Sequence, residues 1–188
     1  NENISYSKLN KKSLDVLVRS GACDSISDQR FKHCKHLWLS VASDRPKNIK
    51  KLAENIEKYR TESDFSEEEK IENVVNLTGI FPFELVLDSK VKERLSYLKV
   101  PPLAEYDEDL QLCWFIPREI IPKKTRNGKT FWIINAIDET CQTTNIKCWN
   151  VRPNEVVHLN RPYVSKLEYD PQWGFSTRSI KWNFKLVG

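Results

Sequence analysis

The spacing of apolar residues changes once along this chain of 188 residues, close to Leu110. Before Leu110, apolar side chains recur every three or four residues, which is typical of α-helices with one buried face. After Leu110, short apolar runs are separated by turn residues, and the pair Asn127-Gly128 favours a β-hairpin. The change predicts an α+β fold, with helices and an acidic connector at residues 1–109 and a β-barrel at residues 110–188.

Local signals divide the helical part into separate helices. Asn10 and Gly21 are typical cap residues on the two sides of the first helix. Ser66 and Glu69 form a capping box in front of the fourth, and Gly79 is its expected end. The expected N-caps of the four helices are Asn10, Ser27 or Asp28, Asp44, and Ser66. A further helix is expected in the later half of residues 81–98.

The barrel part contains five expected strands and no long helix. They cover residues 112–121, 131–137, 146–151, 163–169 and 179–187. Five strands in so short a segment favour an OB-like β-barrel, a five-stranded fold whose loops bind oligonucleotides.

Positive charge is concentrated at the two ends of the chain. Lys and Arg minus Asp and Glu give 13 − 7 = +6 for residues 1–60, 5 − 13 = −8 for residues 61–110 and 12 − 6 = +6 for residues 111–188. The sum is the net charge of +4. Two basic segments around an acidic connector indicate two contact surfaces for a polyanion, with ordinary solvated faces as the alternative.

The first two predicted helices and their glycine turn have the layout of a helix-hairpin-helix. Backbone N–H groups at such a turn can bind a DNA phosphate, a contact that positions DNA without reading its sequence. The candidate DNA-binding residues of this motif are Lys11, Lys12, Arg19, Gly21, Lys32 and Lys35.

Cations and tryptophans occur together in the barrel part. The loop between the first two strands carries four cations in eight residues, and three strands each carry a tryptophan. Single-stranded nucleic acid binds through cationic tracks and aromatic stacking platforms. The candidate residues are Trp114, Lys123, Lys124, Arg126, Lys129, Trp132 and Trp149. Strand alternation directs some of these tryptophans into the core instead, because the pattern does not determine the register.

Two segments resemble the bacterial C-family replicative DNA polymerases (DNA polymerase III alpha subunit). Residues 9–24, LNKKSLDVLVRSGACD, resemble the segment that closes the tandem helix-hairpin-helix of that family. Residues 128–139, GKTFWIINAIDE, resemble a hairpin of its OB domain. The resemblance implies that the first part grips duplex DNA, that the barrel holds single-stranded template, and that other polymerase parts are partners. The family's helix between barrel strands three and four is reduced here to residues 152–157.

The resemblance also implies a peptide that binds a sliding clamp. Its nearest counterpart holds Leu77, Ile80 and Phe81, but it lacks the family's Gln, and Gly79 falls where an apolar residue is expected. The alternative is a helix end at Gly79 followed by Phe81 in the core.

No catalytic residues, metal or cofactor are expected. The dense acidic run at residues 105–109 lies in a proline-flanked linker, and the pair His33 and His36 has no second ligand pair at a suitable spacing. The sequence therefore predicts a non-catalytic DNA-binding segment of a replicative polymerase. A protein-interaction scaffold with a structural barrel and an OB-type RNA-binding module are the alternatives.

Cysteine usage and hydropathy indicate the cellular compartment. The five cysteines are an odd number and favour reduced thiols, and no apolar run is long enough to cross a membrane. We expect a cytoplasmic protein without membrane contact. The chain has no methionine and begins at Asn1, which we interpret as a sign of a fragment or a processed end.

Overall fold

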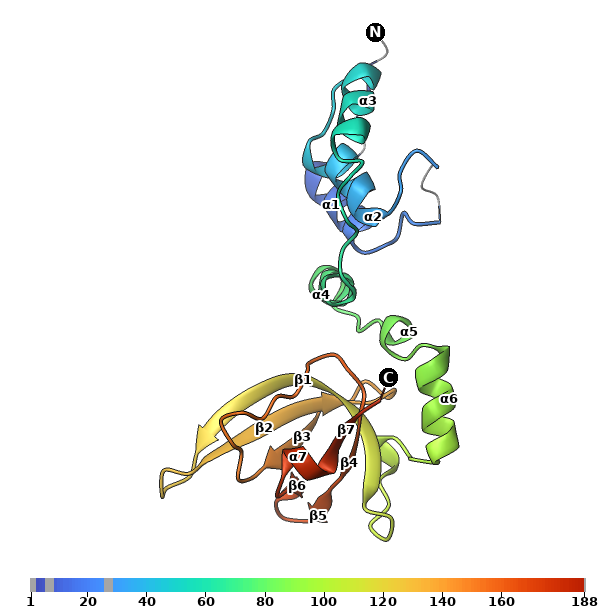
Figure 1. Ribbon diagram of the computed structural model, residues 1–188. Coiled ribbons are helices and arrows are strands. Elements are labelled where there is room, and N and C mark those ends of the chain that lie inside the picture. Colours follow the sequence, from blue (N-terminus) through green and yellow to red (C-terminus); the bar gives the residue numbers. More distant parts are fainter. Residues whose placement is uncertain (1–2, 6–8, 26–28, 188) are drawn as a thin grey trace. The chain divides into compact units, whose positions relative to one another are not determined.

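The structure, a computed structural model, describes residues 3–5, 9–25 and 29–187. Internal contacts divide the chain into two compact units, Asn1–Pro82 and Phe83–Gly188. The described strands all lie in the second unit, and the first of them begins close to the boundary expected at residue 110. Two helices of the expected helical part, α5 (Phe83–Val86) and α6 (Ser89–Leu98), belong to the same unit as the strands (Figure 1).

The first unit is helical. Its described elements are α1 (Lys11–Arg19), α2 (Cys34–Leu37), the π-helical turn η1 (Trp38–Ser43), α3 (Ile49–Lys58) and α4 (Glu67–Thr78). The first predicted helix is confirmed. Oδ1 of Asn10 accepts the N–H of Ser13 at 2.8 Å, and Gly21, at φ 80°, follows the C-terminal end of α1.

The second helix differs from the prediction. Ser27 and Asp28, its expected first residues, lie outside the described residues, and α2 begins at Cys34. The imidazole of His33 caps it by accepting the N–H of His36 at 3.1 Å. The segment between α1 and α2 is therefore longer than the short turn of a helix-hairpin-helix.

The third helix also begins later than predicted. Asp44 does not cap it, because its carboxylate accepts the Tyr59 hydroxyl at 2.8 Å. Asn48 is the N-cap instead, and its side chain accepts the N–H of Lys51 at 2.8 Å. A contact distant in sequence thus withdraws Asp44 from the helix start.

The imidazole of His36 is fully buried in the first unit and uses both of its nitrogens. Nδ1 accepts the N–H of Lys32 at 3.1 Å, so Nε2 carries the proton and donates to the carbonyl of Ile56 at 2.8 Å. His36 therefore links the segment before α2 to α3.

The capping box in front of α4 is confirmed. Oγ of Ser66 accepts the N–H of Glu69 at 3.2 Å, and Oε2 of Glu69 accepts the N–H of Ser66 at 2.7 Å. Gly79 ends the helix at φ 74°, as expected.

Replacing Ser66 with alanine is expected to lower the free energy of unfolding by about 1 kcal/mol, because one N–H of the first turn loses its acceptor. Urea denaturation followed by circular dichroism measures this change. Ser63→Ala removes a hydroxyl from an exposed position before the helix and is the matched control. Equal stabilities of the two variants would contradict the role of the cap.

The second unit contains the sheet. Besides α5 and α6, its described helices are the 3₁₀ turn η2 (Leu103–Glu105) and α7 (Ile180–Asn183). Its described strands are β1 (Leu112–Lys124), β2 (Thr130–Ile137), β3 (Thr144–Cys148), β4 (Tyr163–Lys166), β5 (Glu168–Asp170), β6 (Gly174–Thr177) and β7 (Phe184–Leu186). The expected helix before Pro101 is confirmed as α6, which Asp88 caps by accepting the N–H of Val91 at 2.8 Å.

The described strands form one curled, mixed sheet of seven strands in the order β5-β6-β3-β2-β1-β4-β7. Its pairs are antiparallel except β3 with β6. The long strand β1 curves, pairing with β4 over its first residues and with β2 over the rest (Figure 1). Leu167 alone separates β4 from β5, so the chain itself connects two strands that lie far apart in the sheet order.

The strand count differs from the expected five for three reasons. The fourth expected strand is divided at Leu167, and the sequence pattern did not indicate β6. The last expected strand, residues 179–187, contains α7 and β7. The fold is therefore α+β, as predicted, with a more divided sheet.

The core of the second unit is formed by alternate residues of the strands together with residues from the flanking loops and α7. Its buried members include Leu103, Cys113, Phe115, Ile134, Ala136, Ile146, Cys148, Tyr163, Leu167, Ile180 and Phe184. In β2 and β3 these residues define the inner face of the sheet, and the residues between them define the outer face. None of the helices in the described part of the chain has both the length and the apolar character needed to cross a bilayer.

Candidate nucleic-acid interface

The predicted β1–β2 hairpin is confirmed and ends in a turn at residues 125–129. Lys124 pairs with Thr130, and the N–H of Gly128 donates to the carbonyl of Thr125 at 2.9 Å. Gly128 adopts φ 76°, a left-handed conformation that favours glycine. The turn brings the four predicted cations of this segment to one end of the sheet.

These four cations are exposed and are not neutralised by the protein. Lys123, Lys124, Arg126 and Lys129 make no ion pair within the part of the chain that the structure describes. The segment 123–130 contains no acidic residue, so its formal charge is +4. A compact, uncompensated positive charge of this kind attracts a polyanion.

The outer face of β1, β2 and β3 continues from the hairpin. Phe131 pairs with Lys123, and Ile133 pairs with Ile121 on one side and Lys147 on the other. Paired residues project to the same side of a sheet, so these side chains share the outer face. We call Ile121, Lys123, Phe131, Ile133, Lys147 and Trp149 the outer face of the sheet.

Two aromatic rings stack on this outer face next to the hairpin. The centroids of Phe131 and Trp149 are 4.7 Å apart, and the ring planes are inclined by 27°. The N–H of Trp149 donates to the carbonyl of Thr177 at 2.9 Å, which ties its backbone to the end of β6. Both rings are partly exposed, so they form a preformed stacking platform.

A third ring lies at the turn between β5 and β6. The indole of Trp173 is 64% exposed, and Nζ of Lys147 lies 5.2 Å from its centroid. The same Nζ donates to the carbonyl of Trp173 at 2.9 Å. Because Lys147 belongs to the outer face, this pair connects the face to the β5–β6 turn.

Two of the predicted tryptophans are not on this outer face. Trp114 is only 5% exposed, because its N–H donates to the carbonyl of Pro101 at 2.9 Å and the segment around Pro102 covers that side of β1. Trp132 packs against the core of the sheet, on the same side as Ile134. Neither indole offers the outer face a free ring, so both are removed from the candidate interface, and Trp149 remains.

The predicted helix-hairpin-helix lacks free backbone donors at the positions expected. The N–H of Gly21 donates to the carbonyl of Val18 at 3.1 Å, and that of Lys35 donates to Oδ1 of Asp64 at 3.2 Å. The N–H of His36 is used by His33. These donors therefore stabilise the first unit itself.

Two of the predicted cations of this motif are also engaged within the unit. Arg19 pairs with Asp15 at 3.5 Å, hydrogen-bonds to the side chain of Asn73 and lies 5.6 Å from the Trp38 ring centroid. Nζ of Lys35 lies 5.4 Å from the centroid of Phe65. Lys11, Lys12 and Lys32 are exposed. The exposed lysines of this unit do not form a cluster comparable to the hairpin.

The predicted clamp-binding residues follow the end of α4. Leu77 is half-buried in the last turn of the helix, Ile80 is 69% exposed, and Phe81 is half-buried. Gly79 lies between them as the helix cap, in agreement with the helix-end interpretation of this segment.

Catalytic and metal chemistry find no support in the arrangement of the ionisable groups. In the described part of the chain, His, Cys, Asp and Glu side chains form no group of three or more that could hold a metal ion. The five cysteines are free. Burial raises the pKa values of Cys34, Cys113 and Cys148 to about 12 each, so these groups remain thiols rather than nucleophilic thiolates.

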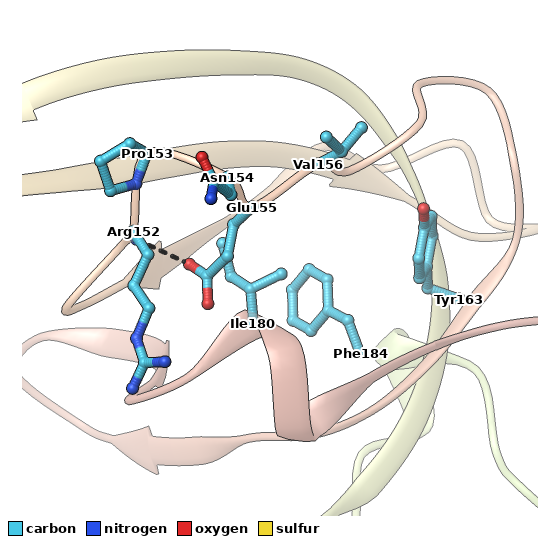
Figure 2. Close-up of a pocket in the computed structure, with 8 residues that line it drawn as sticks. All are labelled: Arg152, Pro153, Asn154, Glu155, Val156, Tyr163, Ile180 and Phe184. Carbon is cyan, nitrogen blue, oxygen red and sulfur yellow. Dashed lines mark hydrogen bonds between the residues drawn. The ribbon is translucent and has the colours of Figure 1, made fainter.

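A cavity of about 700 Å³ lies on another side of the sheet unit, between residues 152–156 and α7. Its floor is the core itself, formed by Tyr163, Ile180 and Phe184 (Figure 2). Arg152 and Glu155 contribute one charge of each sign to its wall. This balance contrasts with the uncompensated charge of the hairpin.

Sequence reasoning missed the residues that join the hairpin to the rest of the face. These are Ile121, Phe131, Ile133, Lys147 and Trp173. The signal that identifies most of them is strand alternation, since each lies between residues of the inner face. Applying it requires the register, which only the paired strands provide.

No protein-family model and no curated protein matches this chain. The function of the outer face is therefore argued from its geometry.

Proposed function

We propose that the second unit binds single-stranded DNA across the outer face of β1, β2 and β3. The observation that carries this proposal is the position of four unpaired cations directly beside the stacked rings of Phe131 and Trp149. The hairpin cations attract the phosphates, while the rings stack with bases that a duplex would keep paired. Stacking on such platforms contributes about 1–3 kcal/mol per base.

The strand pairing supports an OB-like architecture for this unit. When β4 and β5 are counted as one strand interrupted at Leu167, and β6 as the fifth strand, β1 pairs with the second and fourth strands. The third strand pairs in parallel with the fifth, and the fifth pairs with the fourth. We therefore propose a five-stranded OB-like barrel to which β7 is added at the edge of β4.

The position of the face within this architecture also supports the proposal. OB folds bind oligonucleotides on strands two and three, between the loops that follow strands one and four. Here these loops are the hairpin turn 125–129 and the turn of Trp173, and Lys147 on β3 contacts the latter. The helix that usually follows strand three is missing among residues 149–162, where the structure has turns instead.

The proposal is restricted to the second unit. In the first unit Arg19 and Lys35 contact other side chains, and the N–H of Gly21 is used by α1. The wider proposal, that the chain is part of a C-family replicative polymerase with further polymerase parts as partners, rests on residues 9–24 and 128–139 alone.

The affinity of the full chain for a fluorescent oligothymidylate is expected to fall about 50-fold between about 50 and 200 mM NaCl. The estimate follows from four neutralised phosphates and a slope of about −0.7 per phosphate for single strands. Fluorescence anisotropy at several salt concentrations measures the slope.

Competition separates the proposal from its alternatives. Displacement by unlabelled single-stranded DNA but not by the matching duplex is the expected result. Tighter binding of oligouridylate than of oligothymidylate would favour an RNA-binding module, and salt-independent or absent binding would favour a protein-interaction scaffold.

A further inference from the structure

A cavity of about 310 Å³ lies at the end of β2 and β3 opposite to the hairpin. Tyr106, Tyr169 and Phe175 line it, together with Glu108 and Asp138. All of these residues belong to the second unit, and none belongs to the outer face. The cavity is thus a separate feature, with aromatic rings and acidic groups as its distinguishing chemistry.

The three rings of the cavity are held in place by the fold. The Tyr106 hydroxyl donates to the carbonyl of Leu167 at 2.8 Å, and Tyr169 and Phe175 are cross-strand partners of β5 and β6. Ring centroids are 5.0 Å apart for Tyr106 and Phe175, and 4.9 Å apart for Tyr169 and Phe175. A ligand therefore meets a preformed aromatic wall, and Tyr169 is 44% exposed to it and to solvent.

The carboxylate of Asp138 is fixed at the cavity by three donors. It accepts the N–H of Ala104 at 2.6 Å, and the N–H and hydroxyl of Thr140 at 2.9 and 2.6 Å. Its side chain is only 2% exposed. One acidic group therefore has a defined position beside the aromatic wall.

Further acidic groups surround the opening. Glu105, Asp107, Glu108 and Asp109 are exposed and make no ion pair within the described residues. No basic residue lines the cavity. Burial raises the pKa of the Tyr106 phenol, and neighbouring negative groups, Glu108 among them, raise it further, so the local potential is negative.

We propose that this cavity binds the ammonium group of a lysine side chain from a protein partner. An ammonium is attracted by the faces of aromatic rings and by carboxylates at the same time. The acidic run at residues 105–109 provides complementary charge for a basic segment on either side of that lysine. Phosphates are repelled by the same groups, so a nucleic acid is not the occupant.

The test uses a short acetylated peptide, glycine-lysine-glycine, added to the ¹⁵N-labelled full chain at constant ionic strength. Saturable shifts of the amide resonances of Ala104 and Thr140 are expected, because both amides donate to Asp138. The same peptide with an acetylated lysine Nζ has no charge and is expected not to shift them.

Two variants and one control locate the binding. Glu108→Gln is expected to weaken the peptide about threefold, and Tyr169→Ala about tenfold, in line with an exposed ion pair and a cation–π contact. Glu84→Gln removes an exposed carboxylate from α5 and is expected to leave affinity unchanged.

Several outcomes would overturn the proposal. They are unshifted amides at saturating peptide, equal binding of the acetylated peptide, and equal affinity of the Glu108→Gln and Tyr169→Ala variants to that of the unaltered chain. Displacement of the peptide by oligothymidylate from these same amides would assign the cavity to nucleic acid instead.

Discussion

Replacing Lys123, Lys124, Arg126 and Lys129 with glutamate is expected to weaken oligothymidylate binding at least about 100-fold at about 50 mM NaCl. Each phosphate that a cation neutralises releases counterions, and at low salt this release contributes close to a decade of affinity per contact. The four side chains are exposed and unpaired within the described residues, so the substitution breaks no internal ion pair. Fluorescence anisotropy measures the affinity, and the salt slope is expected to approach zero.

A control variant with the same change in net charge separates local contact from general attraction. Exposed lysines elsewhere in the second unit serve this purpose, and the control replaces Lys90, Lys92, Lys166 and Lys185 with glutamate. Lys166 and Lys185 belong to β4 and β7, outside the proposed interface. The control is expected to retain most of the affinity and of the salt slope. Equal losses in the two variants would contradict a site at the hairpin.

Signals that act within a few residues predicted the local structure well. Asn10, Ser66 and Gly79 cap helices through contacts with backbone groups three or four residues away, and all three agree with the structure. Asp44 fails as a cap because Tyr59, fifteen residues later, takes its carboxylate. The first kind of contact is visible in a sequence, whereas the second depends on the packing of α3.

The face of each tryptophan could not be predicted, because it depends on strand register. The pair Asn127-Gly128 is compatible with several turn lengths, and the observed turn spans residues 125–129. A turn longer or shorter by one residue would exchange the inner and outer residues of β2 relative to β1. In β1 a shift of register near Pro117 changes the alternation again. The hairpin cations were predictable without this knowledge because a turn exposes all of its side chains.

Trp114 illustrates a second limit, which is the covering of one strand by a distant segment. A bridge between Pro102 and Trp114 buries the side of β1 that alternation alone would leave open. Pro101 and Pro102 indicate the end of α6 in the sequence, but not where the chain continues. The interface therefore became narrower at Trp114 and wider at Trp173, which no strand pattern included.

Removing both rings of the platform, with Phe131→Ala and Trp149→Ala together, is expected to weaken oligothymidylate binding about 30-fold without changing the salt slope. Stacking depends on the rings and not on charge, so its loss lowers affinity equally at every salt concentration. The N–H of Trp149 keeps its bond to Thr177, because that bond uses the backbone. Affinity from fluorescence anisotropy and stability from urea denaturation are measured on the same protein.

The matched control for the platform is Tyr97→Ala. Tyr97 is 86% exposed on α6, so its substitution removes an aromatic ring from the second unit outside the proposed interface. Its affinity is expected to equal that of the unaltered chain. A platform variant that binds as tightly as the Tyr97→Ala control would restrict the interaction to the hairpin cations, and single-stranded and duplex DNA would then compete equally. Loss of binding with an unchanged salt slope would instead assign base stacking to Phe131 and Trp149, and phosphate contact to the hairpin.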